Sequence, residues 1–202
     1  MNFTPVITYS IIAVNVVISL TALYIAPAFL EKGYLKPYRV VRQNTWYELI
    51  SSGFLHANIG HLFVNMFTFY FFGRILEHII GPGYFIGLYF SGIIISAIPS
   101  MIKYRNDPSY ATLGASGAVS SVLFAFIFLF PFQSIYLMFI PIPIPAILMG
   151  FLYLLYSMYA SKQERGRINH EAHTAGAVWG ILYLIIFMPH SVTRFLSLLG
   201  LN

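Results

Sequence analysis

Six apolar segments, separated by glycines, prolines or charged residues, constrain the fold of this chain more than any other feature. Charged residues make up only 8% of the 202 residues, whereas a soluble domain carries roughly 25%. A helix needs about 20 apolar residues to span a membrane. The segments lie at about 5–26, 59–80, 84–102, 115–130, 135–160 and 171–188. The sequence therefore predicts an all-α, integral multi-pass membrane protein, a bundle of six transmembrane helices in which residues 1–202 form a single domain.

The connection between the first two segments, residues 27–57, is long and mixes basic with aromatic side chains. It contains Lys32 and Arg39 beside Tyr38 and Trp46. Tyrosine and tryptophan rings favour the depth of the lipid headgroups, where basic side chains meet anionic lipid. We expect a long first loop that lies in the membrane interface and is partly inserted in it.

Two segments differ from an ordinary span. The fourth, 115–130, has only about 16 residues, so its first turn should lie below the membrane surface. The fifth, 135–160, contains Pro141, Pro143 and Pro145 near its start, and each proline removes a backbone donor and resists helix continuation. The first part of the fifth segment should therefore be irregular and movable.

Alternation of six spans places the starts of the second, fourth and sixth on one side of the membrane. Their first turns hold His61, Ser116 and His173. A serine near a histidine can act as a nucleophile with its general base. Gly114 and Gly117 flank Ser116 and leave an open approach to its hydroxyl and to the backbone N–H groups of a helix start. The alternatives are structural, because membrane serines often bond the backbone and a core histidine can make a single satisfied hydrogen bond.

His61 and Asn65 are four residues apart and share one helix face. Both side chains can donate hydrogen bonds, and hydrocarbon penalises such donors when they have no partner. A developing oxyanion needs donors of this kind. We therefore predict an oxyanion-binding pair, with hydrogen bonding between helices as the alternative for either residue alone.

His173 is followed by Gly176 and Gly180 on the same helix face. Small residues at this spacing let two membrane helices approach backbone to backbone. We expect this face to pack against the helix that begins with Ser116 and Gly117.

Several chemistries are disfavoured by the residues present. The chain has no cysteine, which removes disulfides, cysteine nucleophiles and thiolate metal sites. Asp107 is the only aspartate, so a pair of catalytic aspartates is not available. His170 and His173 are three residues apart around Glu171, whereas a metalloprotease helix spaces its two histidines four apart. We expect no metal, no cofactor and no nucleic acid partner.

Three motifs follow one another along the chain: His61-Leu62-Phe63-Val64-Asn65 (HxxxN), Gly114-Ala115-Ser116-Gly117 (GxSG), and Ala172-His173 with Gly176 and Gly180 (AHxxGxxxG). With the long first loop, they give a chain that resembles the rhomboid intramembrane serine proteases in their basic six-helix form. The resemblance covers nearly the whole chain and implies a serine endopeptidase that acts through an acyl-enzyme. Its partners would be membrane lipids and single-span membrane proteins, whose transmembrane segments it would cleave.

The resemblance also implies a role for each motif residue. Ser116 would be the nucleophile and His173 the general base. His61, Asn65 and the backbone N–H of Ser116 would form the oxyanion hole.

Three positions differ from the family pattern. Tyr47 stands after Trp46 where arginine is usual, and Ile79 stands two residues after Glu77, again where arginine is usual. Ser120 stands where many members carry an aromatic residue that stacks on the catalytic histidine. These differences concern the bracing of the first loop and the way the histidine is held, not the chemistry.

The usual prokaryotic rhomboid has an outward-facing site, and we predict location in the plasma membrane. Nine of the eleven basic residues nevertheless lie on the side of Ser116, which the positive-inside rule would face to the cytoplasm.

Two other functions remain open. A proteolytically inactive rhomboid-like protein would bind membrane segments without cutting them, and its mark would be the loss of Ser116 or His173. A transporter would show internal repeats or polar groups at mid-bilayer, whereas here the polar groups cluster at one end.

Overall fold

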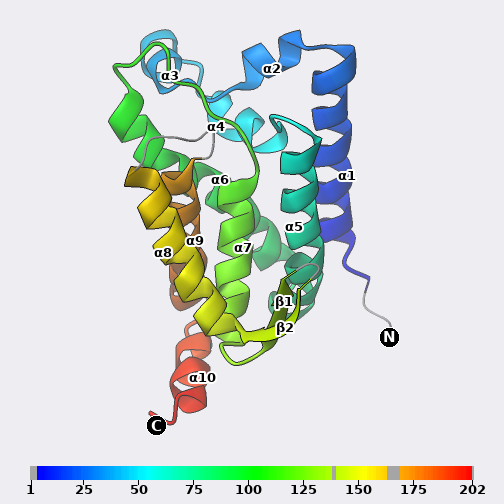
Figure 1. The fold of residues 1–202 in the computed structure, drawn as a ribbon, viewed down its shortest axis with the longest axis vertical. Coiled ribbons are helices and arrows are strands. Elements are labelled where there is room, and N and C mark those ends of the chain that lie inside the picture. Colours follow the sequence, from blue (N-terminus) through cyan, green and yellow to red (C-terminus); the bar gives the residue numbers. More distant parts are fainter. Residues whose placement is uncertain (1–3, 138–139, 163–168, 202) are drawn as a thin grey trace.

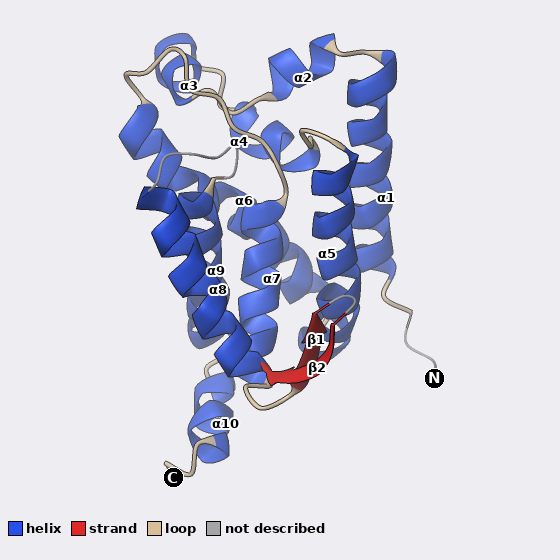
Figure 2. Cartoon of the chain, viewed as in Figure 1, coloured by secondary structure: helices blue, strands red, loops and turns tan. Residues whose placement is uncertain are grey.

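The computed structural model describes residues 4–137, 140–162 and 169–201, which form a helical bundle (Figure 1). Six helices correspond to the six apolar segments, and Figure 2 shows that a small hairpin supplies the strands. They are α1 (Val6–Leu20), α5 (Ile59–Ile80), α6 (Pro82–Tyr104), α7 (Ser116–Leu129), α8 (Ala146–Lys162) and α9 (His170–Phe187). The predicted all-α membrane bundle is confirmed.

Three helices among the described residues are long and apolar enough to cross a membrane. They are Val6–Ile25, in which α1 continues into the π-helical turn η1 (Thr21–Ile25), then α5 and α6. A further helix, α10 (His190–Leu198), follows α9 at an angle of 114°, and the pair would make a fourth span. The chain is therefore a multi-pass membrane protein, and α10 is an element that the apolar segments did not predict.

The short helix α7 lies in the middle of the bundle and begins well below the upper end of α1 (Figure 1). Every residue from Gly117 to Leu129 is buried, and the helix packs against α5, α6, α8 and α9. Because protein rather than lipid surrounds α7, its 14 residues do not have to match the thickness of the hydrocarbon core.

The prediction of a helix from about residue 135 was wrong. Strand β1 (Ser134–Leu137) instead pairs antiparallel with β2 (Ile140–Pro145), and α8 begins only at Ala146. Ile135 faces Ile144 and Tyr136 faces Pro143 in this ladder. Proline cannot continue a helix because it lacks the N–H, whereas in alternating Ile-Pro sequence the isoleucines keep an N–H at every second strand position. The segment that was expected to be irregular is thus a hairpin.

The long first loop contains three short helices, α2 (Ala28–Gly33), α3 (Pro37–Gln43) and α4 (Glu48–Ser51), and the turn η2 (Ser52–Phe54). They cover the upper end of the bundle in Figure 1. A backbone bridge joins Leu35 to Thr112, with N–H to O distances of 2.9 and 3.0 Å in the two directions. The loop is therefore attached to the segment that leads into α7.

A buried carboxylate braces this loop. Glu48 is fully buried and accepts hydrogen bonds from Arg39 Nε at 2.5 Å and from the Lys36 backbone N at 2.8 Å. Tyr47, which stands where arginine is usual in the family pattern, is 56% exposed. The charge that holds the loop thus comes from Arg39, so the loop does not depend on an arginine at position 47.

Glu77 links the end of α5 to the start of α1. It lies near the end of α5, is buried, and its carboxylate accepts the backbone N–H groups of Ile7 at 3.0 Å and Thr8 at 2.8 Å. The Thr8 hydroxyl donates a third bond at 2.6 Å. The first N–H groups of a helix lack intrahelical partners and carry partial positive charge. The start of α1 therefore compensates the carboxylate, and Ile79 can stand where an arginine is usual.

Candidate active site

Ser116 is the first residue of α7, and the turn before it depends on glycine. Gly114 has φ of 125°, a conformation that side chains disfavour. A Cβ atom there would also lie 2.6 Å from His61 Cε1. The Gly114 N–H donates to the Ser52 carbonyl at 2.9 Å, which ties the turn to the first loop. Ser116 itself is half-buried, and as a helix start it presents N–H groups without intrahelical partners.

The oxyanion candidates lie across this turn on α5. Asn58 caps the helix by accepting the His61 backbone N–H at 2.8 Å. Asn65 is buried one turn further on, and its Nδ2 donates to the His61 carbonyl at 2.9 Å. An amide nitrogen carries two hydrogens, so the second remains to be donated. The His61 ring packs against Gly114 and so faces the start of α7.

Helices α7 and α9 touch along a seam of small residues. A Cβ atom at Gly176 would overlap the backbone carbonyl of Gly117, and one at Gly180 would overlap that of Ser121. The Ser121 hydroxyl bridges the helices by donating to the Gly176 carbonyl at 2.9 Å. Ser116 directly precedes Gly117, and His173 lies one turn before Gly176, so both lie at the upper end of this seam.

Among the residues that the structure describes, two rings lie beside His173. The Tyr153 ring of α8 is nearly parallel to the imidazole, at 19° with 6.2 Å between the ring centroids. The His170 ring lies edge-on at 5.8 Å. The Tyr153 hydroxyl is 2.9 Å from Ser120 Oγ. Tyr153 was not predicted from the sequence, because it belongs to none of the three motifs and lies on a helix between the second and the third.

Asn169 is a second residue that sequence analysis missed. Its Oδ1 caps α9 by accepting the Ala172 backbone N–H at 3.0 Å, and its Nδ2 donates to Ser100 Oγ at 2.7 Å. The cap therefore aligns the start of α9 against α6. Asparagine immediately before an apolar helix is a recognised N-cap signal, so the pattern could have been found.

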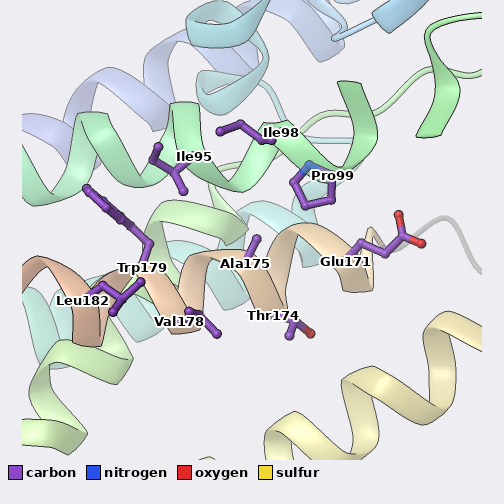
Figure 3. A pocket seen from close by; sticks show the side chains of 9 residues that line it. All are labelled: Ile95, Ile98, Pro99, Glu171, Thr174, Ala175, Val178, Trp179 and Leu182. Atoms are coloured by element: carbon purple, nitrogen blue, oxygen red, sulfur yellow. The ribbon is translucent and has the colours of Figure 1, made fainter. Parts of the chain in front are cut away.

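Two cavities differ in their relation to Ser116. A small one of about 30 Å³ is lined by Ser116, Ser96, Thr112 and Asn169, among others, and has the size and polarity to hold water. A larger, mainly apolar one of about 500 Å³ lies between α6 and α9 (Figure 3). Neither Ser116 nor His173 lines the larger cavity.

His56 lies in the loop before α5 and is fully buried. Its Nδ1 is 2.9 Å from Ser19 Oγ on α1, and its ring meets the His61 ring edge-on at 5.1 Å. Burial, with a smaller effect of His61, lowers the pKa of His56 to about 3. The side chain is therefore neutral in the folded protein near pH 7.

This pKa predicts a pH-dependent stability. An unfolded histidine titrates near pH 6.5, so below that pH the unfolded chain binds a proton that folded His56 does not. The free energy of unfolding should fall as the pH falls from 6.5 toward 3, by at most about 1.4 kcal/mol per pH unit. Thermal unfolding in detergent between pH 7 and 4.5 should show a steeper loss of Tm in wild type than in His56→Gln. Equal slopes would contradict the prediction.

These residues define a class of helical membrane proteins in which a serine and a histidine lie on adjoining helices near one end of the bundle. Comparison with known proteins agrees with this class. The Rhomboid domain model matches residues 43–190, which is most of the chain, and the chain belongs to the rhomboid family.

Individual relatives support the family. "RHOMBOID-like protein 12, mitochondrial" from Arabidopsis thaliana is 33% identical over 144 residues, covering 64% of this chain and 43% of that protein. "Rhomboid protein 1, mitochondrial" from Saccharomyces cerevisiae is 30% identical over 182 residues, covering 88% and 52%. "Putative rhomboid protease YdcA" from Bacillus subtilis is 26% identical over 161 residues, covering 77% and 74%.

The chain spans about half the length of the first two of these relatives. Their names place both in mitochondria, so they do not support the predicted location in the plasma membrane. What is established is a multi-pass membrane protein of the rhomboid family.

Proposed function

We propose that this protein is an intramembrane serine endopeptidase in which Ser116 is the nucleophile and His173 the general base. The observation that carries the proposal is the seam at which Gly117 meets Gly176, because it brings the first turns of α7 and α9 together. Membership of the rhomboid family also supports the proposal. So does the His61 ring, which packs on Gly114 just before the first turn of α7. Residues 1–202 act as a single transmembrane domain in this proposal.

The reaction is an acyl transfer in two halves. His173 removes the hydroxyl proton of Ser116 as Oγ attacks the carbonyl carbon of the scissile peptide. The negative oxygen is stabilised by the Ser116 backbone N–H and by the side chains of His61 and Asn65. His173 then donates its proton to the leaving amine. Water attacks the acyl-enzyme with His173 again as base, which releases the acid and restores Ser116.

The substrates are the transmembrane segments of single-span membrane proteins, which reach the site laterally past α8. A helix shields its own amide groups by internal hydrogen bonds, and in lipid those bonds are costly to break. Cleavage should therefore occur near small or helix-breaking residues, where a few peptide groups can leave the helix.

A fluorophosphonate, which phosphonylates activated serines, tests the nucleophile directly. In liposomes the protein should cleave at least one of a panel of single-span substrates, and mass spectrometry should find the label on Ser116. Ser120 and Ser121, both buried in α7, are internal controls that should stay unmodified. A folded protein that neither reacts at Ser116 nor cleaves would favour the inactive, segment-binding function.

A further inference from the structure

Tyr153 of α8 contacts both the proposed general base and the helix that carries the proposed nucleophile. Given the proposed protease function, we propose that Tyr153 is the positioning residue for His173, and that α8 holds the imidazole in its reactive orientation through this side chain.

The first observation is the stack. The rings of Tyr153 and His173 are 6.2 Å apart between centroids and 19° from parallel, which lies within the range of offset aromatic pairs. A stacked ring limits rotation of the imidazole about its χ2 bond. The stack therefore restricts the direction in which the two ring nitrogens point.

The second observation fixes Tyr153 itself. Its hydroxyl is 2.9 Å from Ser120 Oγ, and Ser120 is buried on α7 one turn after Ser116. The Tyr153 ring also packs at 5.7 Å from the Phe124 ring, one further turn along α7. Contacts at both its ring and its hydroxyl hold the tyrosine in one orientation.

Ser120 explains why the aromatic ring beside His173 comes from α8 and not from α7. A serine is too short to reach the imidazole, but its hydroxyl can pair with a tyrosine that does. The Ser120 and Tyr153 side chains together thus fill the place beside His173 that many rhomboids fill with one aromatic residue on α7.

The fit between α8 and α7 determines where this ring lies. Ala146 and Gly150 are buried and share a helix face with Tyr153. A Cβ atom at Gly150 would lie 3.0 Å from Ile127 Cδ1, so α8 packs closely on α7 at that point. At the start of α8, the Ala146 N–H donates to the Gln133 carbonyl at 2.9 Å. Any substrate that displaces this helix would also move the ring away from His173, which links lateral entry to the orientation of the base.

Four single variants and one double variant in liposomes test the inference. Tyr153→Ala should lower kcat about 10- to 100-fold, the loss expected when a catalytic group is misplaced, with KM changed less than about twofold. It should also shift the pH profile of kcat/KM, because the environment of the base changes. Tyr153→Phe and Ser120→Ala should show smaller, equal losses that do not add in the double variant, since each breaks the same hydrogen bond. Phe151→Ala, an exposed aromatic residue of the same helix, should match wild type.

A rescue separates positioning from general stability. Combining Ser120→Tyr with Tyr153→Ala should return an aromatic ring to the imidazole from α7 and recover part of the lost kcat. Tyr153→Ala with wild-type kcat and pH profile would overturn the inference. So would a loss of kcat no greater than that of Phe151→Ala. If wild type itself neither cleaves nor reacts with the fluorophosphonate at Ser116, the proposed function fails, and the inference fails with it.

Discussion

Alanine at Ser116 should abolish cleavage, with kcat/KM lowered by about 10⁴-fold or more. The proposed reaction passes through a covalent bond to Ser116 Oγ, and alanine removes that atom. His173→Ala should cost a comparable factor, because an unassisted hydroxyl is a weak nucleophile at neutral pH. The double variant should be no slower than either single one, since the two groups act as a unit. Single-turnover cleavage of a single-span substrate in liposomes measures all three.

The control for this set is Ser10→Ala, which removes an exposed hydroxyl on α1. It should leave the cleavage rate unchanged. Both catalytic variants should retain the Tm of wild type within a few degrees, because Ser116 and His173 are only partly buried. Cleavage by Ser116→Ala at the wild-type rate would remove the assignment of the nucleophile.

The seam between α7 and α9 predicts the largest effect on stability. Gly176→Ala would place a methyl group into the backbone carbonyl of Gly117, so the helices must separate or bend. Overpacking of this kind costs typically 1–3 kcal/mol, and at a backbone contact we expect about 3 kcal/mol or more. For a chain of this size that corresponds to a fall in Tm of roughly 6–12 °C. Thermal unfolding of purified protein in detergent is the measurement.

A matched glycine is available as the control. Gly83 lies in the first turn of α6, and a Cβ atom there would have no neighbouring atom within 4 Å. Gly83→Ala should therefore keep the Tm of wild type or raise it slightly. Equal Tm values for Gly176→Ala and Gly83→Ala would show that the seam can open without cost. The close contact would then not be what holds α7 and α9 together.

The parts of the site that carry local patterns were predictable from sequence. Alternation of spans brings His61, Ser116 and His173 to one side because helix direction reverses at each crossing, and glycine spacing marks the contacting faces of α7 and α9. The hairpin before α8 was missed because a run of isoleucine and proline fits a broken helix as well as a strand, and periodicity alone cannot separate them.

Contacts between distant parts of the chain were not predictable in the same way. Tyr153 meets His173 across the close packing of α8 on α7 at Gly150, and the Glu77 carboxylate accepts N–H groups of α1 where the family pattern has an arginine at position 79. In both cases the same kind of contact is made, a ring beside an imidazole or a donor beside a carboxylate. The residue that makes it comes from a different helix. A motif specifies only the position that usually makes the contact, so it cannot predict a contact made by a residue on another helix.

The burial of α7 has a consequence for how the protein responds to its surroundings. Since residues 117–129 are covered on all sides by other helices, changes in bilayer thickness cannot tilt or stretch this helix directly. Such stress acts first on the outer helices, which adapt by tilting. The serine at the start of α7 is thereby insulated from the lipid, and membranes of different thickness should leave its immediate geometry the same.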